Sequence, residues 1–150
     1  MDAGKACRSP KEFGHVGEVR MSGDDRPVRI IFDTSAILAY MWGSIHAGEP
    51  LAEVALEGGV VGLPALCLAE AHCTAGDDDR LNLLIEHHAT VVVPLSRDWM
   101  ALTEIQHAVG IPDATAAMMS AIDKHSFVLT ARSGLYAGLD NGGLVIQMPR

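Results

Sequence analysis

The 150-residue chain is 49% hydrophobic, which is enough apolar material for one sizeable core in a single domain. Its net charge of −8 comes entirely from residues 28–150, where six basic side chains stand against fourteen acidic ones. Because non-specific nucleic-acid binding comes mostly from Lys and Arg, this acidic body excludes a general phosphate-binding surface. If the protein binds nucleic acid, we expect it to do so at one local site, through metal ions.

The first 27 residues are predicted to form a flexible tail, because they are rich in Gly, Pro, Ser and both charges and show no sustained periodicity. We expect neither a signal peptide nor a membrane span, since no apolar run approaches the roughly 20 residues that a spanning helix needs. A cytoplasmic location is therefore expected. Cys7, Cys67 and Cys73 are expected to be reduced thiols, because three cysteines cannot all pair internally.

The organised part of the chain begins with a β-branched run, VRIIF at 28–32, which predicts a strand that ends at Asp33. A helix is predicted for 34–43, with Thr34 or Ser35 near its cap. A second helix, over 50–59, is followed by a strand over 60–64. The remaining predicted elements are helices at 65–73, 77–88, 97–110 and 111–125 and strands at 90–95, 127–130 and 144–148.

Strands that alternate with helices predict an α/β fold: a parallel sheet with helices on both faces, within a single domain over 28–150. In such open sheets the functional crevice lies beyond the carboxyl ends of the strands. Three acids fall near that edge: Asp33 after the first strand, Glu70 in the helix after the second, and Asp113 at the start of the helix before the fourth.

All three acids are embedded among apolar or small neighbours, and a buried carboxylate needs a cation, a metal or hydrogen-bond donors. Three in one place indicate a divalent metal. Each also has a simpler interpretation. Asp33 and Asp113 could cap the helices that follow them, and Glu70 could be a solvated helix residue.

The stretches RIIFDTSAILAYM, GLPALCLAEAH, GIPDATAAMMSAIDKHSFVLTARSGLY and LVIQMP resemble, in order and spacing, the PIN domain, especially the VapC-like toxins of bacterial toxin–antitoxin pairs. The resemblance covers about residues 28–149. It implies a Rossmann-like three-layer fold in which Asp33, Glu70 and Asp113 are catalytic and bind Mg²⁺ or Mn²⁺ for the hydrolysis of RNA. It also implies RNA as the substrate, an antitoxin protein as partner and a homodimer.

The same resemblance places Thr130 at the hydroxyl position that ends the fourth strand and Ser35 near the site entrance, both as substrate-binding residues. Two residues after Thr130, where the family often presents a fourth acid, this chain has Arg132. That arginine would either pair with Asp113 or Asp33 and weaken metal binding, or hold a substrate phosphate, or lie in a surface turn and do neither.

Two alternatives to an active ribonuclease stay open. Arg132 and the scarcity of basic residues suit a catalytically weakened PIN-fold protein that binds RNA or a protein. A receiver-like or flavodoxin-like protein would share only the acidic edge. A zinc site at Cys67, His72 and Cys73 is disfavoured, because it lacks four closely paired ligands, and neither a Walker loop nor a dinucleotide fingerprint is present.

Overall fold

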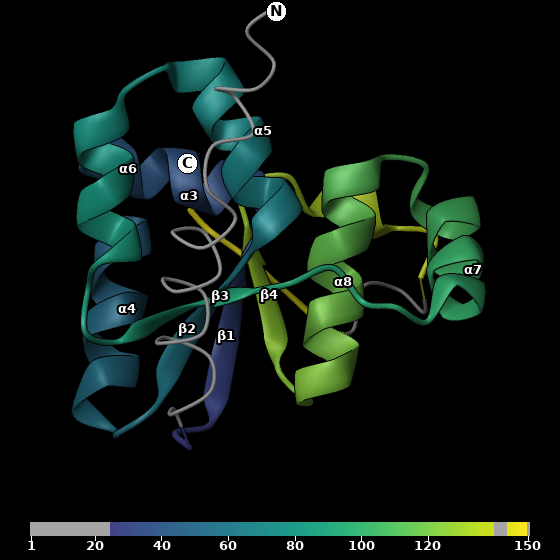
Figure 1. Cartoon of the computed structure of the whole chain (residues 1–150), viewed down its shortest axis with the longest axis horizontal. Helices are drawn as coiled ribbons and strands as arrows, with labels where there is room; N and C mark the ends of the chain where they lie inside the picture. The colour runs from purple at the N-terminus through teal and green to yellow at the C-terminus, as the bar shows by residue number, and fades with distance from the viewer. Residues whose placement is uncertain (1–24, 140–143, 150) are drawn as a thin grey trace, which may run out of the picture.

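The computed structural model describes residues 25–139 and 144–149. At its centre is a five-stranded sheet, in which every neighbouring pair is parallel, with the order β3-β2-β1-β4-β5 (Figure 1). The strands are β1 (Val28–Phe32), β2 (Val60–Pro64), β3 (Thr90–Val93), β4 (Phe127–Thr130) and β5 (Val145–Gln147). The predicted α/β architecture, a parallel sheet flanked by helices in a Rossmann-like arrangement, is therefore confirmed.

The helices flank the sheet in two groups. In Figure 1 the first lie on the left and top of the view, and α7 and α8 lie on the right. They are α3 (Thr34–Met41), α4 (Ile45–Leu56), α5 (Ala65–Ala75), α6 (Asp78–Ile85), α7 (Trp99–Val109) and α8 (Pro112–Lys124), with a 3₁₀ turn, η1 (Ser133–Tyr136). No helix of the described residues is long and apolar enough to cross a membrane.

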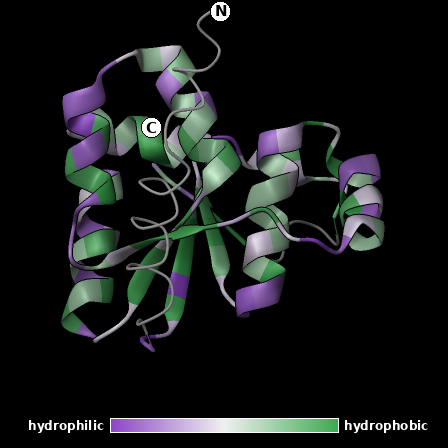
Figure 2. Ribbon diagram, in the orientation of Figure 1, coloured by the Kyte–Doolittle hydropathy of each residue, from purple (hydrophilic) through white to green (hydrophobic). Residues whose placement is uncertain are grey.

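The core lies between the sheet and these helices, and the central strands are predominantly hydrophobic in Figure 2. Helix α8 buries eight successive residues, 114–121, because it packs against strands β1, β2 and β4 on one side and against helices α5 and α7 on others. Most of these residues are Ala, Ser or Thr, whose small side chains let the helix lie close to the sheet, as the sequence predicts. Helix α8 is thereby held rigidly, and its first turn projects beyond the strand ends.

The start of helix α4 differs from the prediction. The helix was expected to begin at Pro50, but it begins at Ile45, with the hydroxyl of Ser44 accepting from the amide of His46 at the cap. Pro50 lies inside the helix, where it lacks the N–H that would bond to the preceding turn. Proline favours a helix start but does not require one, and the Ser44 cap decides the boundary here.

The ends of other elements shift by a few residues. The strand predicted for 90–95 ends at Val93, and the helix predicted for 77–88 covers Asp78–Ile85, so His87 and His88 lie beyond it as a stacked pair. Residues 1–24 lie outside the described residues. The predicted tail and the single-domain boundary at 28 stay predictions.

Candidate active site

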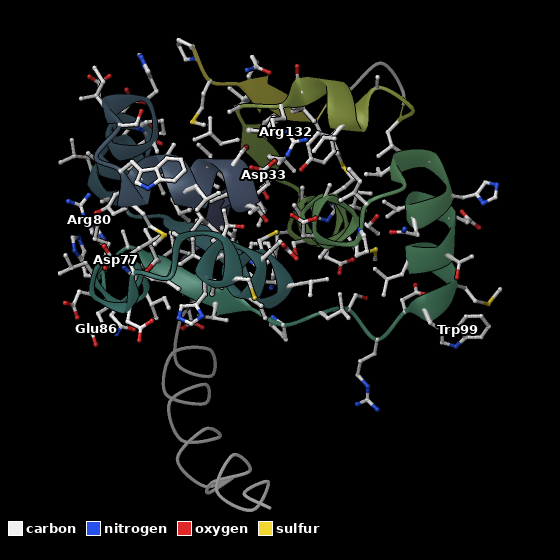
Figure 3. All side chains as sticks on the ribbon, turned by 90° about the horizontal axis from the view of Figure 1, so that it is seen from above. Asp33, Asp77, Arg80, Glu86, Trp99 and Arg132 are labelled. Atoms are coloured by element: carbon white, nitrogen blue, oxygen red, sulfur yellow. The ribbon has the colours of Figure 1, made fainter. Side chains whose placement is uncertain are left out.

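The three predicted acids line one pocket of about 470 Å³ at the carboxyl edge of the sheet. Figure 3 looks down on this edge and shows Asp33 and Arg132 close together, with Trp99 far away on α7. Asp33 follows β1, Glu70 lies in α5, and Asp113 lies in the first turn of α8. The other lining residues are Thr34, Ser35, Leu38, Leu66, Thr74, Ile111, Pro112, Ala114, Arg132 and Leu135.

Asp33 is buried, with 3% of its surface exposed, and its carboxylate is bonded on both oxygens. Its Oδ1 accepts from the hydroxyl of Ser35 at 2.7 Å and from the amide of Ala36 at 3.0 Å, and its Oδ2 accepts from the hydroxyl of Tyr136 at 2.8 Å. The bond from Ala36 makes Asp33 the N-cap of α3, so the simpler interpretation of this acid is confirmed. The three donors offset the cost of burying its charge.

The hydroxyls of Ser35 and Thr130 form a chain that ends on Asp33. The amide of Arg132 donates to Thr130 Oγ1 at 2.9 Å, and the two hydroxyl oxygens lie 3.2 Å apart. Because the proton of Ser35 goes to Asp33, the Thr130 hydroxyl donates to Ser35, which also accepts from the amide of Ala131 at 2.8 Å. Ser35 lines the pocket, whereas Thr130 is fully buried behind it. These contacts support Asp33, and the substrate-binding role of the two residues stays a prediction.

Tyr136 was not singled out in the sequence, yet its side chain is fully buried and donates to Asp33 from 103 residues away. It ends η1, the turn that carries Arg132 at its start. Burial and the nearby Asp33 charge raise the pKa of the Tyr136 hydroxyl well above its usual range, so the phenol stays protonated and remains a donor. The one feature of the sequence that could have pointed to Tyr136 is its place as a large aromatic residue shortly after the end of β4.

Asp113 does not cap α8, which corrects one of the two cap interpretations. The cap residue is Ile111, no side chain bonds to the free amides of the first turn, and Pro112 supplies the first helical position. The half-buried carboxylate of Asp113 instead accepts from the hydroxyl of Thr34 at 2.5 Å. This bond joins the first turn of α8 to the start of α3, and so holds Asp113 beside Asp33.

Cys67, in α5, is fully buried and lies next to Asp113. Its thiol donates to the backbone carbonyl of Asp113 at 3.2 Å. Burial raises the pKa of the Cys67 thiol well above its usual range, and the negative charges of Asp33 and Asp113 act in the same direction. Cys67 and the exposed Cys73 are both free thiols, whereas Cys7 lies outside the described residues. The reduced state expected of the three cysteines stays a prediction.

Glu70 and Arg132 are the two exposed charged residues of the pocket. Glu70 is solvated, as its simpler interpretation predicted, although it still lines the pocket. The guanidinium of Arg132 forms no ion pair with any described residue, so the alternative in which it pairs with Asp113 or Asp33 is not realised. Arg132 nevertheless lines the same pocket as the three acids and brings one positive charge to it.

The donor chemistry of the pocket fits a hard divalent cation. Within the described ranges, no three His, Cys, Asp or Glu side chains are gathered closely enough to hold a metal ion as they stand. Mg²⁺, however, is usually bound through one or two carboxylates and keeps several waters. Asp33 retains acceptor capacity on Oδ2, and neither Asp113 Oδ1 nor the Glu70 carboxylate bonds to another described residue. Asp33 and Asp113 would hold such an ion, with Glu70 at the rim.

Comparison with known proteins gives a likeness in fold. No protein-family model matches the chain, and no curated protein sequence matches it significantly. Among solved structures, a toxin–antitoxin complex from Klebsiella pneumoniae is similar, with a TM-score of 0.60 at 13% sequence identity. The match covers 79% of this chain and 96% of that chain. At this identity the likeness supports the α/β fold alone.

Proposed function

We propose that the protein is a Mg²⁺- or Mn²⁺-dependent endoribonuclease of the PIN-domain type, similar to the VapC-like toxins. The observation that carries this proposal is the convergence of Asp33, Glu70 and Asp113 on one pocket beyond the strand ends. The three residues come from three separate elements. Independent helix caps and surface acids would have no reason to share that pocket, whereas a hard cation needs oxygen ligands in one place.

A bound divalent cation would supply water activation and would neutralise charge that builds on the phosphate. The residues of the chain divide the remaining tasks. Asp33 and Asp113 provide fixed carboxylates, because each is bonded to neighbouring hydroxyls. Arg132 brings a positive charge to the acidic pocket, and its guanidinium suits two oxygens of a phosphate group.

The test uses two substitutions that spare the Asp33 cap. Asp113→Asn and Glu70→Gln are expected to lower metal-dependent RNA cleavage by about 10²-fold, because each removes a carboxylate from the pocket. Asp123→Asn is the matched control, since Asp123 is exposed near the other end of the same helix. Cleavage should be followed on a labelled single-stranded RNA, with EDTA as the metal-free reference. Unchanged cleavage in both site variants would exclude the proposal.

A second candidate has its own observation. Arg132 occupies the pocket, and the three acids are not gathered into a ready metal site, which favours a catalytically weakened PIN-fold protein that binds RNA or a protein. This candidate predicts RNA binding that survives EDTA and no turnover by wild type. Metal-dependent turnover that Glu70→Gln destroys would rule it out.

If the ribonuclease is a toxin, the proposal also includes a partner protein and a cellular location. As a toxin, the chain would require a neutralising antitoxin, would form a homodimer and would act in the cytoplasm on RNA. The solved structure of similar fold belongs to a toxin–antitoxin complex, which suggested this setting for the proposal. Expression of the wild-type chain should arrest growth of a bacterial host, and Asp113→Asn should relieve the arrest. Normal growth on expression of soluble wild type would count against the toxin role.

A further inference from the structure

The hydrogen bonds at Asp33 limit how many ligands its carboxylate can still accept. A carboxylate has about four lone-pair positions, two on each oxygen. Both positions on Oδ1 are taken, one by the Ser35 hydroxyl and one by the Ala36 amide. One position on Oδ2 is taken by the Tyr136 hydroxyl. Asp33 therefore has one lone pair left for anything that enters the pocket.

Tyr136 is placed firmly enough to keep its position on Oδ2. Its ring belongs to the hydrophobic core and none of its surface is exposed. The turn around it is bonded on both sides, from the amide of Ala137 to the carbonyl of Gly134 and from the amide of Leu139 to the carbonyl of Tyr136. A buried phenol that lost Asp33 would be left without an acceptor, so both partners favour the contact.

We propose that Tyr136 is a positioning residue for Asp33 and that, together with Ser35 and the Ala36 amide, it restricts the pocket to a single divalent cation. This inference rests on the proposed metal-dependent function. Two-ion sites are built around carboxylates that clamp a pair of ions about 4 Å apart. Asp33 cannot bridge such a pair, because bridging needs at least two free lone pairs. It also cannot chelate one ion through both oxygens, since Oδ1 is saturated.

The experiment measures Mn²⁺ binding to the purified full chain by the electron paramagnetic resonance signal of free Mn²⁺, without RNA. Wild type is expected to bind one Mn²⁺ per chain. Tyr136→Phe is expected to bind it about 10- to 100-fold more weakly, because partners that orient a metal ligand typically contribute that much to affinity. The chain has two tyrosines, so Tyr40→Phe is the matched control. Tyr40 lines a different pocket, and its hydroxyl bonds to no described residue.

Far-UV circular dichroism at the binding temperature verifies that each variant is folded, which separates a change in affinity from a loss of structure. Two tightly bound Mn²⁺ per wild-type chain would overturn the inference and leave the proposed function standing. Equal affinities for wild type and Tyr136→Phe would overturn the positioning role. The wild-type stoichiometry decides the one-ion claim even if that variant does not fold.

The two proposals fail in different ways. Wild type that binds no Mn²⁺ at millimolar concentration would overturn both. One Mn²⁺ per chain with the expected loss in Tyr136→Phe, but no RNA cleavage, would support the one-ion site and overturn the ribonuclease.

Discussion

Replacement of the three acids by alanine should affect stability in a graded way, because the fold uses each acid differently. Asp33→Ala removes the N-cap of α3 and leaves the hydroxyls of Ser35 and Tyr136 without their acceptor. A lost cap costs about 0.5–2 kcal/mol, and each buried donor left unpaired costs about 1–3 kcal/mol. Relief from burying the charge offsets part of this sum, so we expect a net loss of about 3–5 kcal/mol.

The other two acids should matter less for folding. Asp113→Ala removes one hydrogen bond to a half-buried carboxylate, from Thr34, and should cost about 1–2 kcal/mol. Glu70→Ala removes an exposed side chain whose carboxylate bonds to no described residue, so its effect should be close to zero. The contrast matters because Asp33 is then both a site residue and a structural one.

Urea denaturation in EDTA, followed by far-UV circular dichroism, measures the free energy of unfolding of each variant without metal. Circular dichroism is preferable to tryptophan fluorescence, because Trp42 and Trp99 are 66% and 71% exposed already. If Asp33→Ala were as stable as wild type, or if all three variants lost the same amount, the assignment of these hydrogen bonds would be refuted.

Four further changes test the structure and its pocket. Gly48→Ala should stabilise the fold by about 0.5–1 kcal/mol, because the added Cβ meets open space at a position inside α4. Gly62→Ala should destabilise it by about 1–3 kcal/mol, since the added Cβ would come within 2.6 Å of a core side chain. Thermal denaturation measures both variants, and a Gly62→Ala variant more stable than Gly48→Ala would contradict the packing. The free energy of unfolding should fall as pH rises above about 9, because the raised pKa values of Cys67 and Tyr136 keep these groups neutral in the fold while they ionise in the unfolded chain. Each group lowers the free energy of unfolding by up to ~1.4 kcal/mol per pH unit. Urea titrations that show a constant free energy of unfolding up to about pH 11 would refute this prediction. Arg132→Asp should raise Mg²⁺ affinity, seen as a larger metal-induced rise in Tm than in wild type, and an unchanged rise would show that the arginine does not weaken the site.

Elements bounded by strong local signals could be predicted from the sequence. Strands β2 and β4 match their predicted ranges because each is a short apolar run that ends at a clear breaker or polar residue. Helix α4 could not be predicted as well, because Pro50 is a strong signal for a helix start and the weaker Ser44 cap prevailed. Local patterns rank such competing signals poorly, since packing of the whole helix decides between them.

The site shows the same division. Asp33 follows a strand and Asp113 opens a helix that leads into one, so a predicted parallel sheet places both at the same edge, and they line one pocket there. The partners of these acids depend on contacts that the sequence does not reveal. Thr34 bonds to Asp113 and Tyr136 bonds to Asp33 across 79 and 103 residues, so no periodicity or motif connects them.

The chain of hydrogen bonds from residue 132 to Asp33 begins at a backbone amide, and this has a consequence for how the site can evolve. Every residue except proline supplies that amide, so the side chain at 132 can change while Thr130, Ser35 and Asp33 keep their arrangement. A single substitution could therefore exchange a cation for an acid in the pocket without a cost in folding. Position 132 thus tunes the chemistry of the pocket independently of the scaffold around it.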